Sequence, residues 1–167
     1  MNFIGNLFTS FFRMFGLFKK DAKIIFVGLD DAGKTSLMSV LKYGSIRQYD
    51  PTIHAHAEEI EIGKMKVHSV DLGGHKTVRK VWRDYFPKID AIIYLIDAAN
   101  PARFEESRIE FQGIIETQDI GDVPILILGN KVDKVRLKNL KPIIFLLNFG
   151  FFPKKIVLTV KNTAVSE

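Results

Sequence analysis

The sequence predicts an α/β fold: a doubly wound, mostly parallel sheet with helices on both faces. Three short apolar runs predict buried parallel strands, namely "KIIFVG" (Lys23–Gly28), "AIIYLID" (Ala91–Asp97) and "VPILILGN" (Val123–Asn130). Helical patterns accompany them at Gly33–Leu41, Val78–Phe86 and Pro101–Thr117. Because strand and helix patterns alternate, ligands are expected at the carboxyl ends of the strands.

A hairpin is expected beside these strands. The stretch "EEIEIGKMKVHSVD", Glu58–Asp71, alternates polar and apolar residues on either side of Gly63–Lys64. This period of two is typical of an antiparallel pair with one solvated face.

Composition excludes several classes of protein. The 167 residues are enough for one domain with a sizeable core, and 47% hydrophobic with 26% charged residues indicates a globular chain. The chain has no cysteine, so disulfide frameworks and thiolate metal sites are excluded, which suits the cytosol or a cytosolic membrane face.

The net charge of +5 does not indicate nucleic-acid binding. Seven basic residues and one acidic residue lie from Lys134 to the end, so the rest of the chain is nearly neutral. The chain divides into three regions. These are an N-terminal segment (residues 1–20), the main domain (residues 21–133) and an atypical tail (residues 134–167).

Residues 1–20 predict an amphipathic helix with a broad apolar face. That face consists of Ile4, Leu7, Phe8, Phe11, Met14, Phe15 and Phe18. The polar arc continues throughout, so a membrane span is not expected. We favour a reversible anchor at a lipid surface over a helix docked on its own domain. Asn2 in place of glycine excludes N-myristoylation.

"GLDDAGKT", Gly28–Thr35, matches the phosphate-binding motif G-x-x-x-x-G-K-[ST] between a strand and a helix. Backbone amides and the helix N-terminus would hold phosphates, the lysine would reach the β- and γ-phosphates, and the threonine hydroxyl would bind Mg²⁺. The expected phosphate-binding residues are Asp31, Ala32, Gly33, Lys34, Thr35 and Ser36. A nucleoside triphosphate site follows.

"NKVD", Asn130–Asp133, predicts that the base is guanine. The Asp133 carboxylate can accept hydrogen bonds from N1–H and the 2-amino group of guanine, which adenine cannot supply. Asn130 would contact N7 and brace the loop, and the Lys131 stem would stack on the base.

Two further segments are candidates for sensing the γ-phosphate. In "DLGGH", Asp71 would bind Mg²⁺ through water and the Gly74 amide would contact the γ-phosphate. In "DPTI", the Thr52 hydroxyl would bind Mg²⁺ only in the triphosphate state.

These residues resemble the Sar family, in the Arf-like branch of the small GTPases, which are P-loop NTPases. The resemblance covers Asn2–Asp133, about four-fifths of the chain, and rests on "GLDDAGKTSL", "PTIHAHAEEI", "VDLGGHKTVRKVWRDYFP" and "VPILILGNKVD". It implies a switch that hydrolyses GTP to GDP and recruits the coat protein complex II at endoplasmic reticulum membranes. The implied partners are membrane lipids, inner coat subunits, a GTPase-activating partner and an exchange factor on that membrane.

The resemblance also implies roles for single residues and a location. His75 stands where Ras and Arf relatives carry glutamine, and it would orient the attacking water. Asp30 would assist around Mg²⁺. The N-terminal helix would be sequestered with GDP and released with GTP. No arginine finger is evident within the chain, so hydrolysis is expected to be slow without a partner. The protein would be cytosolic and peripheral on endoplasmic reticulum and Golgi membranes.

One departure lies inside the phosphate-binding motif. The family usually has asparagine where this chain has Asp31. A carboxylate facing a polyphosphate predicts faster GDP release than in an Asp31→Asn variant, unless it points to solvent.

The tail is the second departure. About 34 residues are too few for a further helix, a sixth strand with its base-supporting loop, and a final helix. Lys154–Val160 could imitate the strand, with Asn162–Ala164 as a poor base loop. We favour a translated noncoding insert at Val135–Lys161, because its removal joins "NKVDK" to "NTAVSE", which resembles the family's continuation. An incomplete domain would expose Ile24–Val27 and Ile125–Leu128, or leave the Phe-rich tail to cover them.

Two rival functions remain at this point. One is a catalytically defective membrane adaptor whose helix and Phe-rich tail bind lipid around a degenerate GTPase domain. The other is an ATP-using enzyme, which Asp133 disfavours.

Overall fold

A computed structural model describes residues 3–14, 16–17, 21–45, 56–62, 65–71, 79–117, 120–134 and 156–160. Thr52, Gly74 and His75 lie outside these ranges. The candidate base loop at Asn162–Ala164 does so too.

The fold is built on one sheet of six strands in the order β2-β3-β1-β4-β5-β6. The strands are β1 (Asp21–Gly28), β2 (His56–Ile62), β3 (Met65–Asp71), β4 (Ala91–Asp97), β5 (Ile125–Asn130) and β6 (Ile156–Val160). All neighbours are parallel except the hairpin β2–β3, where Ile62 pairs with Met65. The predicted doubly wound α/β fold and its hairpin are confirmed.

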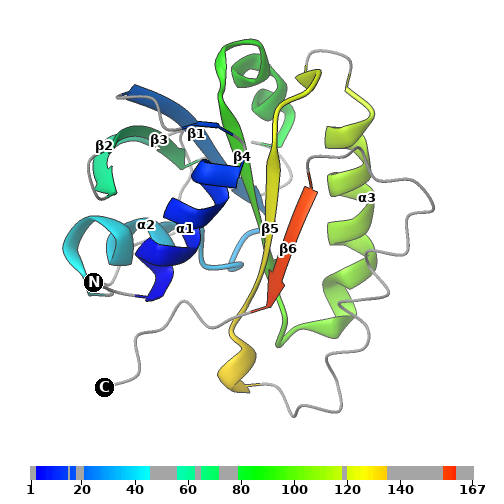
Figure 1. The fold of residues 1–167 in the computed structure, drawn as a ribbon. Coiled ribbons are helices and arrows are strands. Elements are labelled where there is room, and N and C mark those ends of the chain that lie inside the picture. Colours follow the sequence, from blue (N-terminus) through cyan, green and yellow to red (C-terminus); the bar gives the residue numbers. More distant parts are fainter. Residues whose placement is uncertain are drawn as a thin grey trace.

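Helices cover both faces of the sheet (Figure 1). They are α1 (Phe3–Met14), α2 (Lys34–Tyr43), the 3₁₀ helix η1 (Arg79–Lys88), the short η2 (Pro101–Arg103), α3 (Phe104–Ile115) and the short η4 (Val132–Lys134). The segment predicted at Val78–Phe86 is wound as a 3₁₀ helix and ends with Pro87 inside it.

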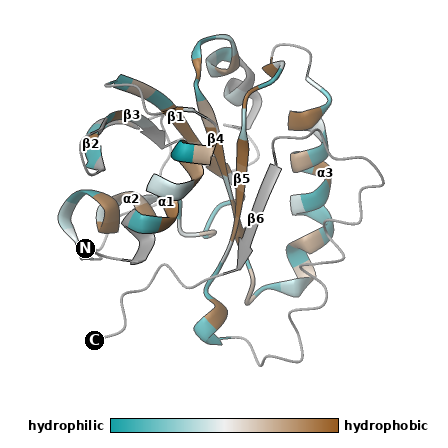
Figure 2. Cartoon of the chain, in the orientation of Figure 1, coloured by the Kyte–Doolittle hydropathy of each residue, from teal (hydrophilic) through white to brown (hydrophobic). Residues whose placement is uncertain are grey.

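Strand β1 shows how the sequence divides between the two faces. Ile24 and Phe26 face a cluster with α1 and α2, whereas Ile25 and Val27 face a cluster with η1 and α3. Among the residues that the structure describes, the central strands are strongly hydrophobic (Figure 2). Of the two outcomes expected for an incomplete domain, exposure of Ile24–Val27 and Ile125–Leu128 is wrong, because both runs are buried.

Helix α1 is docked on the domain, which is the alternative that the sequence reading disfavoured. Phe8, Phe11 and Phe12 are buried, and the Phe8 ring centroid lies 6.4 Å from that of Phe26 in β1. The spacing 8, 11, 12 is one stripe of an α-helix, so Phe12 belongs to the packed face. Met14, predicted on that face, is 67% exposed. No described helix is long and apolar enough to cross a bilayer.

The tail supplies the sixth strand. Residues Ile156–Val160 pair in parallel with Ile125–Gly129 of β5, so the alternative that Lys154–Val160 imitates the sixth strand is confirmed, against the favoured view that the tail is too short for it. The run "IVLTV" is rich in β-branched residues, which suit extension of a sheet at an open edge. A noncoding origin of Val135–Lys161 stays a prediction, which sequencing the transcript tests.

Candidate functional site

The phosphate-binding loop joins β1 to α2 at the carboxyl edge of the sheet. Its first glycine, Gly28, has a φ of 140°, and a Cβ there would lie 2.3 Å from the Leu95 carbonyl oxygen of β4. Gly33, the last loop residue before α2, has a φ of 91°. The loop therefore turns where only glycine is unstrained and where the neighbouring strand leaves no room for a side chain.

Lys34 begins α2 and lies inside this loop. Its side chain is 5% exposed, and its Nζ donates hydrogen bonds to the carbonyl oxygens of Gly28 at 3.1 Å and Leu29 at 2.9 Å. Thr35 and Ser36 follow in the first helical turn and are half-buried. The loop thus encircles a cationic group at a helix N-terminus, an arrangement suited to anions.

The guanine motif lies against the phosphate loop. Asn130 ends β5, is 3% exposed, and donates from Nδ2 to the Ala32 carbonyl oxygen at 2.9 Å. A Cβ on Gly33 would lie 2.2 Å from this same Nδ2. Because β4 lies between β1 and β5, with Leu95 beside Gly28 and Asp97 beside Asn130, the two motifs meet at one edge.

Lys131 connects the two motifs by charge. Its Nζ lies 3.0 Å from Oδ2 of Asp31 in the phosphate loop and 3.0 Å from Oδ2 of Asp97 at the end of β4. Burial lowers the pKa of Lys131, but the two carboxylates outweigh burial and leave that pKa above its usual value. Asp133 follows in η4 and is exposed.

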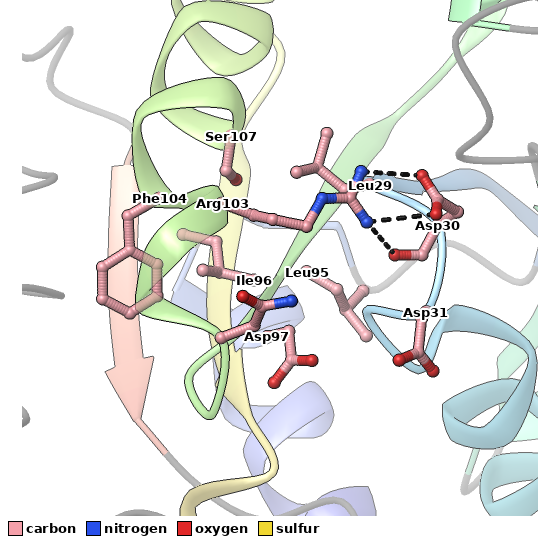
Figure 3. A pocket seen from close by; sticks show the side chains of 10 residues that line it. Leu29, Asp30, Asp31, Leu95, Ile96, Asp97, Arg103, Phe104 and Ser107 are labelled. Carbon is pink, nitrogen blue, oxygen red and sulfur yellow. Dashed lines mark hydrogen bonds and ion pairs between the residues drawn. The ribbon is translucent and has the colours of Figure 1, made fainter.

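The other loop aspartate, Asp30, is held from the opposite side. Arg103 of η2 donates to both of its carboxylate oxygens, from Nη2 to Oδ1 at 2.8 Å and from Nη1 to Oδ2 at 3.0 Å. The Asp30 and Glu106 carboxylates hold the pKa of Arg103 above its ordinary range. Figure 3 shows this pair across a small pocket that Leu95, Asp97 and Phe104 help to line.

The structure brings together most, not all, of the predicted site. The backbone of Asp71 is placed at the end of β3, paired with Phe26 of β1. Its side chain lies outside the described residues, as do Thr52, Gly74 and His75. Among the residues that the structure describes, no group of three or more His, Asp or Glu side chains could hold a metal ion. Thr35, in the first turn of α2, supplies a hydroxyl oxygen, and oxygen atoms are the ligands that Mg²⁺ takes beside phosphate and water.

Sequence reasoning missed Asp97 and Arg103. Asp97 could have been found, because it is the polar residue that ends an apolar strand expected beside the phosphate loop. Arg103 could not, because 73 positions separate it from Asp30 and no motif contains it.

Comparisons with known proteins agree with this geometry. The ADP-ribosylation factor family matches residues 8–165 of the chain. The small COPII coat GTPase SAR1 of Giardia intestinalis is 43% identical over 129 residues, which cover 77% of this chain and 68% of that protein. The small COPII coat GTPase SAR1 of Nicotiana tabacum is 43% identical over 113 residues, 68% of this chain and 57% of that protein.

A solved structure gives the same result for the fold. The small GTPase Arl6 (BBS3) of Trypanosoma brucei, with a bound nucleotide analogue GppNp, superposes with a TM-score of 0.70 at 25% identity. The match covers 86% of this chain and 87% of that one.

Proposed function

The chain belongs to the ADP-ribosylation factor family of small GTPases, enzymes that hydrolyse GTP, and we propose that it is a switch of the SAR1 type. In this proposal it recruits the coat protein complex II to endoplasmic reticulum membranes for transport to the Golgi. The 43% identity to SAR1 relatives supports the SAR1 type. The observation that carries the nucleotide switch is the hydrogen bond from Asn130 to Ala32, since it fixes the guanine motif against the phosphate loop.

Guanine nucleotide would bind across these two motifs. Amides of Asp31–Ser36 and the Lys34 ammonium would hold the phosphates, while Asp133 accepts hydrogen bonds from guanine. Lys131 is already oriented across the site by Asp31 and Asp97, so its aliphatic stem is available to stack on the base.

Mg²⁺ fits the oxygen donors of this edge. Thr35 would hold the ion directly and Asp30 would assist around it, with Thr52 and Asp71 as further ligands by family resemblance. When bound, the ion would neutralise phosphate charge.

Hydrolysis would depend on His75 and on a partner. The His75 imidazole would orient the attacking water, and a GTPase-activating coat partner would supply the missing arginine. The expected acceleration by such an arginine is on the order of 10³–10⁵.

Membrane attachment would use α1. Its aromatic face is buried on the domain, so lipid binding requires release of that face from the core. Burial of each phenylalanine stabilises the docked helix by roughly 1.5–3 kcal/mol, so release must be coupled to GTP and to lipid contacts. An exchange factor on the endoplasmic reticulum membrane would load the nucleotide.

Single-turnover GTP hydrolysis tests the proposal. Full-length chain loaded with GTP is followed with and without purified inner coat partner, beside a His75→Ala variant. A SAR1-type switch is accelerated by the partner, and the variant is not.

Other outcomes identify the rivals. Binding of GDP and lipid vesicles without any acceleration indicates the catalytically defective membrane adaptor. Preferential binding of ATP in a competition assay indicates an ATP-using enzyme.

A further inference from the structure

We infer that Arg103 is a positioning residue for the phosphate loop, which sets the preference of the site for GTP over GDP through its contacts with Asp30. The inference rests on the proposed nucleotide site and adds a residue that no motif contains.

The contact joins a helix to the loop through one guanidinium group. Arg103 donates from Nη1 and Nη2 to the Asp30 carboxylate, and from Nη1 to the Asp30 carbonyl oxygen at 3.2 Å. Its Nε donates to Oε2 of Glu106 at 2.9 Å on the next turn. Because both ends of the planar guanidinium are occupied, the group is held in one orientation.

The carbonyl contact orients the next amide. In a trans peptide the carbonyl of Asp30 and the N–H of Asp31 point in opposite directions. Since this carbonyl points to Arg103, the Asp31 N–H points away from Arg103. Asp31 has a φ of 60°, a conformation that costs a non-glycine residue free energy unless its surroundings enforce it. Arg103 contributes to that enforcement.

The carboxylate contact neutralises charge in the loop. Asp30 lies three residues before Gly33 and directly precedes Asp31–Ser36, the segment whose amides would hold phosphates. An unpaired carboxylate there would repel GTP more than GDP, because GTP carries the additional phosphate charge. The Arg103 guanidinium, which is 30% exposed, offsets this repulsion.

Helix α3 offers a matched control. Arg108 forms an equivalent ion pair with Glu105 three residues earlier, and its other described hydrogen bond is to Gln112. All of these groups belong to α3, so an Arg108→Ala variant removes an arginine without touching the loop.

The test is titration of the full-length chain with fluorescent GDP and with a non-hydrolysable GTP analogue at saturating Mg²⁺. Arg103→Ala is expected to weaken the binding of both nucleotides and to lower the ratio of GTP-analogue affinity to GDP affinity roughly five-fold. Arg103→Lys keeps the charge, so it should preserve the ratio while weakening both nucleotides. Arg108→Ala should match the unmodified chain.

The double variant Asp30→Asn/Arg103→Ala separates charge from packing. The GTP-to-GDP affinity ratio of the double variant should lie within about two-fold of the ratio of Asp30→Asn alone, because neither chain carries the Asp30 charge. Two results overturn the inference. One is a GTP-to-GDP affinity ratio in Arg103→Ala equal to that of the unmodified chain. The other is a fall of this ratio that is just as large when Arg103→Ala is added to Asp30→Asn. Failure of the unmodified chain to bind either nucleotide instead overturns the proposed function.

Discussion

Asp31 and Lys131 form an ion pair of 3.0 Å between the phosphate loop and the guanine motif, and both residues have a left-handed backbone. They are the two non-glycine residues with positive φ in the described part of the chain, with φ of 60° and 59°. Strained residues cluster at functional sites, so this pairing agrees with a shared nucleotide site.

The exposure of this ion pair decides how Asp31→Asn should affect GDP release. The Asp31 side chain is 84% exposed, and an exposed ion pair contributes about 0–1 kcal/mol. Solvent screens an exposed carboxylate from the phosphates as it screens the ion pair, and Lys131 offsets its charge. The exposed position meets the exception stated from the sequence, so GDP release in Asp31→Asn should stay within about two-fold of the unmodified rate. Stopped-flow release of fluorescent GDP measures both rates.

The control for Asp31→Asn is Glu59→Gln. Glu59 forms an exposed ion pair of 3.1 Å with Lys66 in the β2–β3 hairpin, far in the sheet from β5. This variant should release GDP at the unmodified rate. Release from Asp31→Asn about ten-fold slower than from the other two chains would contradict this and show that Asp31 repels the bound nucleotide.

Gly33→Ala should weaken nucleotide binding. The added Cβ would meet Asn130 Nδ2 at 2.2 Å, so the Asn130 side chain must move and the bond to Ala32 must break. With the strain of a φ of 91°, guanine nucleotide affinity should fall at least about ten-fold, as isothermal titration would measure.

Gly113→Ala is its matched control within α3. Nothing lies within 4 Å of a Cβ there, and alanine favours a helix interior over glycine by about 1 kcal/mol. That variant should keep its nucleotide affinity and gain stability. Undiminished binding by Gly33→Ala would show that the loop contact is dispensable.

Phe12→Ala tests the docked position of α1. Phe12 is fully buried, with its ring centroid 5.6 Å from that of Phe11, so truncation should cost about 3–5 kcal/mol of unfolding free energy. Met14→Ala, at a position that is 67% exposed, should change the free energy of unfolding by less than about 0.5 kcal/mol. Urea denaturation compares them, and equal stabilities would mean that α1 is undocked in solution.

The raised pKa of Lys131 predicts a loss of stability at alkaline pH. A group whose folded pKa exceeds its ordinary value of 10.5 contributes stability below that value, and the contribution is lost as pH rises through the folded pKa. Between about pH 9 and about pH 11 the unmodified chain should therefore lose more unfolding free energy than Lys131→Met. Urea titrations at both pH values test this, and parallel losses would contradict it.

The sequence predicted the fold because its strands are strongly patterned. Runs such as Ala91–Asp97 are apolar throughout, and a strand buried on both faces has no other pattern. The phosphate and guanine motifs were predictable for a similar reason, since each follows such a strand directly.

The remaining features depend on contacts that local patterns do not encode. Phe12 belongs to the packed stripe of α1 because of where the domain lies, whereas periodicity alone favoured Met14. The β6 strand forms because β5 has an open edge. The ion pairs of Asp30 and Asp31 join residues far apart in the chain, with polar groups that could equally face solvent.

The most direct test of the central claim, one guanine nucleotide site built from the phosphate loop and the guanine motif, is displacement of fluorescent GDP from the full-length chain. Unlabelled GTP and GDP should displace the fluorescent GDP, and ATP should not. Asp133→Asn should lower the affinity for GDP at least about a hundred-fold, whereas the control Asp84→Asn should leave that affinity unchanged. Displacement by ATP as effective as that by GTP, or full GDP affinity in Asp133→Asn, would contradict the account.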